Sequence, residues 1–211
     1  MSHKDSDSSS DNSPVAPGAH AELPSLNCYL ALKMKKNKGK GKRIHIQFTL
    51  DEIDLYRTKL KKKHQTEPIP IQCGSEVHYS KPADFYLTPS QDFTKFALRH
   101  GDIEIMTCQF EKGKKGGPKT IKVVWKENPD NQIVFVNKKP EKSDNGQYIL
   151  DFDGRYAAPS TQNCILIRED NQELAAMYRS FNEWETDIDA KPGMPDLMLF
   201  GVLLSLDICP F

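Results

Sequence analysis

PDLMLFGVLLSLD occupies residues 195–207, and the ten residues between Asp196 and Asp207 are apolar or small on every side. Pro195 and Asp196 are typical of a helix start. A helix that is hydrophobic on every face has to be buried on every face. At 1.5 Å per residue the ten residues reach only about 15 Å, half of a bilayer core, so we expect them inside protein. A closed β-barrel could enclose such a helix, and a central buried strand is the alternative.

The sequence before this stretch is a succession of short strand-like runs. Residues 44–48 (IHIQF) alternate between apolar and polar, which is the period of a half-buried strand. Residues 26–32 precede them across a basic, glycine-containing segment, and together they predict a hairpin. Further strands are expected at residues 69–73, 84–87, 95–98, 103–110, 120–125, 133–136, 148–152, 164–167 and 175–178. Many short strands with turn signals between them indicate an antiparallel barrel or sandwich.

Two segments differ from this pattern. Residues 51–63 (DEIDLYRTKLKKK) are a helix candidate that Asp51 would cap, and a long strand with a solvated lysine end is the alternative. Residues 1–24 are rich in Ser, Asp, Pro and Gly and hold few large apolar side chains, so we expect a disordered tail. A single folded domain over residues 25–211 follows.

The charges balance over the whole chain but are unevenly distributed. The 29 basic and 29 acidic side chains give a formal net charge of zero, which argues against a polycation that binds nucleic acid. Residues 33–43 hold seven Lys and Arg and no acid, and residues 57–63 hold five more and again no acid. Residues 168–191 hold seven acids and three bases. The folded protein is therefore expected to have a positive side.

Cysteine and histidine positions give no catalytic or metal-binding pattern. The five cysteines form no CxxC pair and no secretory signal precedes them, which predicts a reducing cytosolic or nuclear compartment. The lysine–glycine segments do not follow the nucleotide-loop frame, and no nucleophile elbow occurs. Asp151 and Asp153 would share one face of a strand, and we interpret them as a solvent-facing edge. We expect no enzyme activity, cofactor or metal.

One motif carries a family resemblance. Residues 148–167 read YILDFDGRYAAPSTQNCILI, with the spacing F-x-G-R-x-x-x-x-S-x-x-N from Phe152 to Asn163. This spacing, followed by a Pro-led hydrophobic helix that ends in S-x-D, resembles the C-terminal signature of tubby-like proteins. Ser80-Lys81 before residues 85–87 (FYL), and residues 97–99 (ALR) before a strand, resemble further segments of that family. We expect Arg155 of the motif to pair with a carboxylate or loop carbonyls, with ligand contact as the alternative.

The resemblance implies a closed antiparallel β-barrel of about twelve strands around a buried C-terminal helix. It also implies binding of phosphatidylinositol bisphosphate through Lys and Arg in a surface cleft, and by analogy the ligating residues are Lys81 and Arg99. Where the family has a dense basic run, residues 75–79 here read SEVHY, with one acid and no Lys or Arg. We expect Lys61, Lys62 and Lys63, or the basic segment 33–43, to compensate with charge-assisted contacts to phosphate.

The sequence therefore predicts a monomeric, cytoplasmic adaptor that associates peripherally with the plasma or ciliary membrane and could carry protein cargo. Two alternatives stay open. One is a nuclear, DNA-binding or transcription-associated protein that uses the same basic face, against which the zero net charge argues. The other is a protein-interaction barrel that has lost its specific lipid site.

Overall fold

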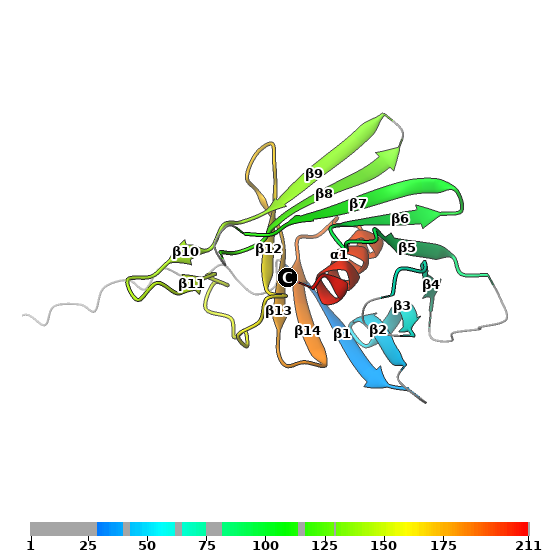
Figure 1. Ribbon diagram of the computed structural model, residues 1–211, viewed down its shortest axis with the longest axis horizontal. Coiled ribbons are helices and arrows are strands. Elements are labelled where there is room, and N and C mark those ends of the chain that lie inside the picture. The colour runs from blue at the N-terminus through cyan, green and yellow to red at the C-terminus, as the bar shows by residue number, and fades with distance from the viewer. Residues whose placement is uncertain are drawn as a thin grey trace, which may run out of the picture.

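A computed structural model describes residues 29–39, 43–61, 65–74, 82–113, 117–128 and 130–210. The described residues form fourteen strands and one helix, and twelve strands close into a barrel (Figure 1). The barrel strands, in ring order, are β1 (Leu30–Lys38), β14 (Glu185–Ala190), β13 (Leu174–Ser180), β12 (Cys164–Arg168), β9 (Asn131–Asn137), β8 (Thr120–Asn128), β7 (Ile103–Glu111), β6 (Lys95–His100), β5 (Phe85–Pro89), β4 (Ile69–Cys73), β3 (Ile53–Leu60) and β2 (Ile44–Leu50).

The barrel closes because β1 pairs on one side with β2 and on the other with β14, both antiparallel. Every neighbouring pair in the ring is antiparallel. Only β10 (Glu141–Lys142) and β11 (Tyr148–Ile149), among the described strands, lie outside the ring, as a separate two-stranded sheet that projects from it in Figure 1. The predicted closed antiparallel barrel is confirmed.

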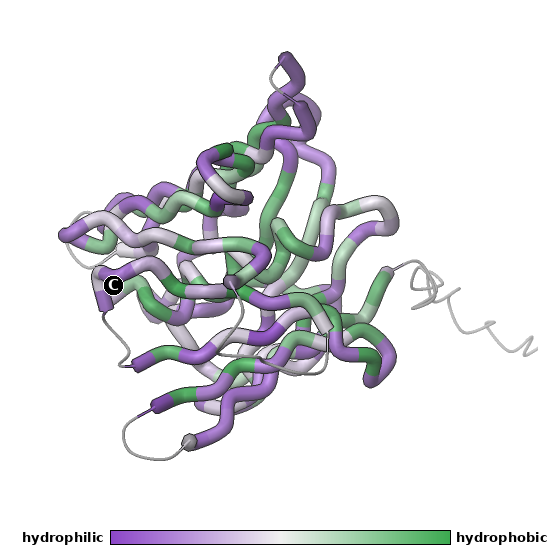
Figure 2. The backbone as a smooth tube through the Cα atoms, turned by 90° about the vertical axis from the view of Figure 1, so that its right-hand side faces the viewer, coloured by the Kyte–Doolittle hydropathy of each residue, from purple (hydrophilic) through white to green (hydrophobic). Residues whose placement is uncertain are grey.

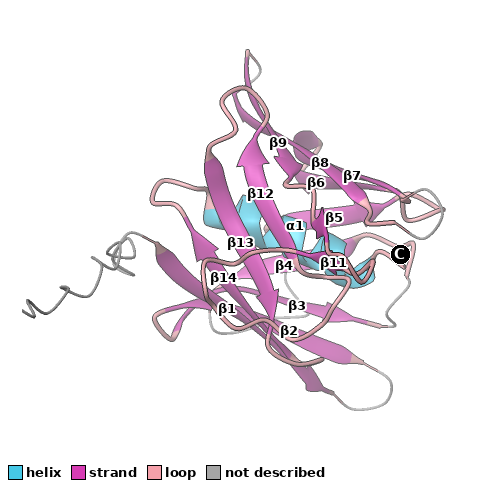
Figure 3. Cartoon of the chain, turned by 90° about the vertical axis from the view of Figure 1, so that its left-hand side faces the viewer, coloured by secondary structure: helices cyan, strands magenta, loops and turns pink. Residues whose placement is uncertain are grey.

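The helix α1 (Asp196–Ile208) is enclosed by the barrel, and its residues from Leu197 onward are buried. Figure 3 shows it behind the wall formed by β12, β13 and β14. Along the strands, hydropathy changes from residue to residue, because one face of each strand packs on the helix and the other meets solvent (Figure 2). Burial of each large helix side chain contributes about 1.5–3 kcal/mol, which makes α1 a main stabiliser. Among the described residues no helix has the length and hydropathy required to cross a membrane.

Aromatic rings fix the helix against the first hairpins. The Phe200 ring stacks on Phe48 of β2 with centroids 5.0 Å apart and on Tyr56 of β3 at 5.8 Å. Tyr56 also donates a hydrogen bond of 3.0 Å from its hydroxyl to Asp196 at the helix start. The start of the helix is therefore joined directly to β3.

The described part of the segment, residues 51–61, is not a helix, which corrects the sequence-based prediction in favour of its alternative, a strand. Asp51 and Glu52 have φ angles of 47° and 67° and form a two-residue turn between β2 and β3. Left-handed backbone at both central positions suits the twist of a two-residue hairpin. The residues that follow alternate, with Thr58 and Leu60 buried, as β3 requires. Asp51 as a possible cap and the apolar residues after it predict a helix. In the structure, however, burial along β3 alternates with the two-residue period of a strand.

Other boundaries differ from the prediction as well. Residues 148–152 form a strand only over Tyr148–Ile149, so Asp151 and Asp153 do not share a strand face. Asp153 has a φ angle of 58°, and its backbone N–H donates to the Asp151 carboxylate across a tight turn. β14 was not predicted at all, and β1 extends through lysines that were expected in a loop. The predicted tail, residues 1–24, lies outside the described residues.

Candidate functional site

The strand order gives the barrel two chemically different ends. Lys38 pairs with Ile44, and Ile44 pairs with Leu60, so β1 ends, β2 begins and β3 ends at the same level. We call this the basic end; it carries the connections β1–β2, β3–β4, β5–β6, β7–β8, β9–β12 and β13–β14. The opposite, acidic end carries the connections β2–β3, β4–β5, β6–β7, β8–β9, β12–β13 and β14–α1.

Charge is divided between these two ends. Over the whole sequence, the six connections at the basic end contain 14 Lys and Arg and seven acids, and the excess comes from residues 39–43, 61–68 and 112–119, which hold ten of the bases and one acid. Among the described residues of the connections at the acidic end, eight are Asp or Glu and one, Lys191, is basic. A protein without net charge thus carries a positive and a negative pole.

One group of described bases at the basic end lies where the first three strands meet. Arg43 is contributed there by the connection that leads into β2, Lys59 by β3, and Lys61 by the connection that leaves β3. His45 lies among them, opposite Lys59 in the register of β2 and β3. Partial burial lowers the pKa of His45, and the positive charges of Lys59 and Arg43 lower it further. The electrostatic potential at the His45 imidazole, where β1, β2 and β3 meet at the basic end, is therefore positive.

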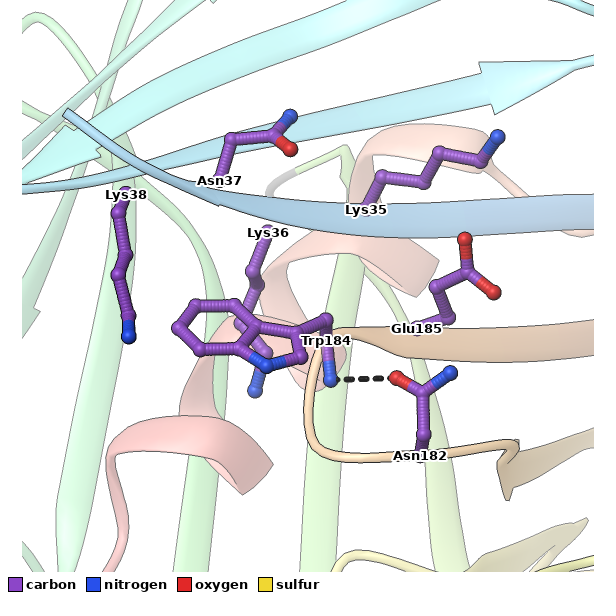
Figure 4. Close-up of a pocket in the computed structure, with 7 residues that line it drawn as sticks. All are labelled: Lys35, Lys36, Asn37, Lys38, Asn182, Trp184 and Glu185. Carbon is purple, nitrogen blue, oxygen red and sulfur yellow. Dashed lines mark hydrogen bonds between the residues drawn. The ribbon is translucent and has the colours of Figure 1, made fainter.

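A hollow of about 510 Å³ opens beside this corner, between β1 and the turn before β14 (Figure 4). Lys36 and Lys38 point to the side of β1 where the Trp184 ring lies, as Figure 4 shows. The Lys38 ammonium lies 5.2 Å from the centroid of the Trp184 ring. The backbone N–H of Lys36 donates to the Trp184 carbonyl over 2.8 Å and fixes the turn against β1. An ammonium over an indole face is a cation–π contact that holds both side chains in place.

A second and larger cavity, of about 1080 Å³, also lies at the basic end. The connection β7–β8 and the long segment between β9 and β12 line it, with Lys112, Lys119, Lys138 and Arg155 as its basic residues. Phe152, Leu150 and Ile149 give it a mainly apolar wall. The basic end therefore offers two hollows, each with lysines among its lining residues.

Of the predicted ligand-binding residues the structure describes Lys61 and Arg99, and these two lie apart. Arg99 lies on β6 next to its pairing partner Tyr86 of β5, and its guanidinium approaches the Glu104 carboxylate at 3.7 Å. Lys126 binds the same carboxylate at 3.0 Å. Lys61 leaves β3 toward the basic end, and β4 and β5 lie between β3 and β6. Adjacent strands are about 4.8 Å apart, so Lys61 and Arg99 are separated by roughly 14 Å across the sheet alone.

Lys62, Lys63 and Lys81, the other predicted ligand residues, lie outside the described residues. Sequence reasoning missed Lys38 and Trp184 as a pair. Lys38 belongs to the basic run at residues 33–43. The neighbouring sequence does not indicate that its side chain lies on the face of β1 that points to the barrel interior. Trp184, from the far end of the sequence, borders the hollow as well.

The F-x-G-R motif forms a clasp that holds the segment before β12 on the outside of β13 and β14. Arg155 lies 3.2 Å from an Asp153 oxygen and 3.5 Å from an Asp189 oxygen, which confirms its predicted structural pairing with carboxylates. Arg179 binds Asp189 as well, at 2.7 Å. Phe152 is buried against Ile165 and Met177 in a small cluster of its own. The motif therefore positions backbone, and its residues Phe152, Gly154 and Arg155 also line the larger cavity.

Buried cysteines support a structural interpretation of the thiols. Cys108, Cys164 and Cys209 are buried, and Cys73 is exposed. Burial raises the pKa of Cys164 to about 12, so its thiol stays protonated at neutral pH. Within the described ranges no group of three or more His, Cys, Asp or Glu is placed to hold a metal ion.

Comparison with known proteins gives no assignment: no family model matches the chain, and no curated protein matches it. The functional interpretation therefore depends on the geometry and charge of this chain's own residues.

Proposed function

We propose that this protein is a non-enzymatic, peripheral membrane-binding domain that attaches to phosphoinositide-containing surfaces through its basic end. The observation that carries the proposal is the separation of charge between the two ends of the barrel. The sequence of the six connections at one end holds 14 bases and seven acids, and the described residues of the connections at the other hold eight acids and one base. A barrel with such poles orients in front of an anionic surface before any specific contact forms.

The basic residues at this end contribute to attachment additively. Basic residues close to an anionic leaflet contribute about 1 kcal/mol each, and the effect falls off within a Debye length. Lys38, Arg43 and Lys61 leave neighbouring strands at the same level, so one approach brings all three to the surface. Several such contacts together give reversible attachment without a membrane-spanning element.

Phosphoinositides are favoured over singly charged lipids because their headgroups carry several phosphate charges. Charge-assisted hydrogen bonds from Lys and Arg are the contacts that such phosphates accept. The hollow beside Lys38, which Glu185 also lines, is large enough for a headgroup, with a volume of about 510 Å³. The resemblance of the motif at residues 148–167 to tubby-like proteins supports the same lipid class. Cytoplasmic location at the plasma or ciliary membrane, and carriage of protein cargo, belong to this proposal.

The test is co-sedimentation with vesicles at physiological salt. One vesicle set contains phosphatidylinositol bisphosphate, a second contains phosphatidylserine at matched total charge, and a third is neutral. We expect strongest binding to the first set, and a loss of about tenfold or more for Lys38→Glu/Arg43→Glu. The control is Lys126→Glu/Lys191→Glu, which makes the same change in net charge near the acidic end.

Three outcomes are informative. Absence of wild-type binding to phosphoinositide vesicles would overturn the proposal. Equal loss in both charge-reversal variants would show that net charge alone matters and that the basic end is not the contact surface. Tighter binding to duplex DNA than to vesicles at the same salt would establish the nucleic-acid alternative instead.

A further inference from the structure

Two aromatic rings project into solvent on the clasp. The Tyr156 side chain is 64% exposed and that of Phe181 is 53% exposed. Their rings meet edge to face, with centroids 5.6 Å apart. Aromatic pairs in this geometry are common in protein cores, whereas this pair presents most of its apolar surface to water. Two exposed aromatic rings side by side form an apolar patch of the kind that marks a contact surface.

The backbone under this pair is held rigidly. Arg179 donates from Nη1 to the Tyr156 carbonyl at 2.8 Å, and the Ala158 N–H donates to the Ser180 carbonyl at 2.8 Å. The Asn163 side chain accepts from the Ser180 N–H and donates to the Ala158 carbonyl, each at 2.8 Å. The F-x-G-R-x-x-x-x-S-x-x-N motif thus fixes the two segments that carry Tyr156 and Phe181. Exposed rings on such a support are preorganised for contact.

The pair lies at the edge of the basic end. Phe181 belongs to the four-residue turn between β13 and β14, and the same turn carries Trp184, which contacts Lys38. Of the acids nearby, Asp187 and Asp189 pair with Arg179, while Glu183, which accepts a hydrogen bond from the Trp184 indole, and Glu185 keep their negative charge. A surface that approaches anionic lipid with Lys38 in front therefore brings the two rings with it.

We infer that Tyr156 and Phe181 form an interfacial anchor that enters the boundary between headgroups and acyl chains when the basic end meets the membrane. The inference deepens the proposed function and rests on it. Tyr is enriched at membrane–water interfaces because its ring is apolar at one end and polar at the other. Salt weakens the attraction of the lysines but leaves the burial of apolar rings almost unchanged. Charge brings the protein to the surface, and the rings retain it there.

The chain offers a matched control. Ile53 and Ile103 are each 67% exposed, and both lie next to turns at the acidic end. The variants Tyr156→Ser/Phe181→Ser and Ile53→Ser/Ile103→Ser each remove two exposed apolar side chains. Both are measured with phosphoinositide vesicles at low and at high salt, after thermal unfolding has shown that each is folded.

We expect Tyr156→Ser/Phe181→Ser to bind about as well as the wild type at low salt and at least about tenfold more weakly at high salt. The Ile53→Ser/Ile103→Ser control should match the wild type at both. In a Trp125→Phe background, the emission of Trp184 should shift to shorter wavelength on binding and be quenched by brominated lipids. An aromatic variant that binds like the wild type at both salts, or Trp184 emission that brominated vesicles leave unchanged, would overturn the anchor.

Failure of the anchor and failure of the proposed function are distinguishable. If Lys38→Glu/Arg43→Glu abolishes binding while Tyr156→Ser/Phe181→Ser changes nothing, the protein binds membranes by charge alone and only the anchor is wrong. If the wild type binds no phosphoinositide vesicle, both are wrong. If the rings matter equally with neutral vesicles, the anchor acts without the charge that the proposed function requires.

Discussion

The Lys36 ammonium lies 2.7 Å from an Asp207 carboxylate oxygen, so the first strand of the barrel is joined to the end of the helix by an ion pair across 171 residues of sequence. The two side chains are only 10% and 3% exposed. The Gln162 amide donates to the same carboxylate oxygen, also at 2.7 Å. Three segments distant in sequence therefore meet at one buried oxygen.

Lys36→Met leaves the Asp207 charge buried with only the Gln162 amide as a partner. Removal of one member of a buried pair costs about 3–5 kcal/mol, whereas replacement of both by apolar residues is often neutral or stabilising. We expect Lys36→Met to lower the free energy of unfolding by that amount and Lys36→Met/Asp207→Leu to restore most of it. Urea unfolding checks both. Equal stability of the single variant and the wild type would mean that the pair contributes little.

Gly201 marks the closest approach of the helix to the barrel wall. A Cβ placed there would lie 2.8 Å from the Met106 methyl group and 3.3 Å from a Leu98 methyl group. Because Met106 ends in a flexible thioether, Gly201→Ala should be tolerated, helped by the higher helix propensity of Ala. Gly201→Leu has no space and should destabilise by about 1–3 kcal/mol or more. Thermal unfolding of the two variants side by side tests the difference.

Arg99 discriminates between two locations for the lipid site. The resemblance places headgroup contacts at Lys81 and Arg99, whereas the charge distribution places them at the basic end. If the basic end is correct, Arg99→Ala should leave vesicle binding within about twofold of the wild type, and Lys38→Ala/Arg43→Ala should weaken it about tenfold. If Arg99→Ala weakens binding more than Lys38→Ala/Arg43→Ala in the same co-sedimentation assay, the lipid site lies at β6 and not at the basic end.

The protonation of His45 is expected to affect the stability of the fold and to respond to bound inositol phosphates. Its pKa is lowered in the folded protein, so between the usual histidine value and the folded value the unfolded chain binds more protons. Stability should therefore decrease as the pH falls through that range, and His45→Gln should remove this dependence. Bound inositol phosphates would replace the positive field of Lys59 and Arg43 by a negative one and raise the pKa. An NMR titration of the His45 ring with and without inositol trisphosphate measures the shift.

The fold was predictable because one segment left few choices. Residues 197–206 are apolar on all sides and too short to span a bilayer, so an enclosing wall of strands followed, and the structure has it. The predicted strand boundaries were wrong where Lys, Asp or Glu occupies the outward-facing positions of a strand. In β14 every second residue is Glu or Asp, which hid Thr186, Ile188 and Ala190 as the buried face.

The site was less predictable because it depends on strand order. The basic runs 33–43 and 57–63 are visible in the sequence, but only the pairing of β1, β2 and β3 brings their ends to one level. Tyr156 and Phe181 lie on different segments and meet only through the clasp. Nothing local distinguishes an exposed aromatic from a buried one, so burial of both was the ordinary expectation.

The pairing of Leu30 with Ala190 has a consequence for biosynthesis. Chains are synthesised from the amino end at about 5–20 residues per second, so β1 waits roughly 8–32 s before the strand that closes its free edge exists. The helix that fills the interior is made later still. During that interval the nascent polypeptide holds strands with apolar faces and nothing to cover them, so a ribosome-bound chaperone is the partner this architecture would need first.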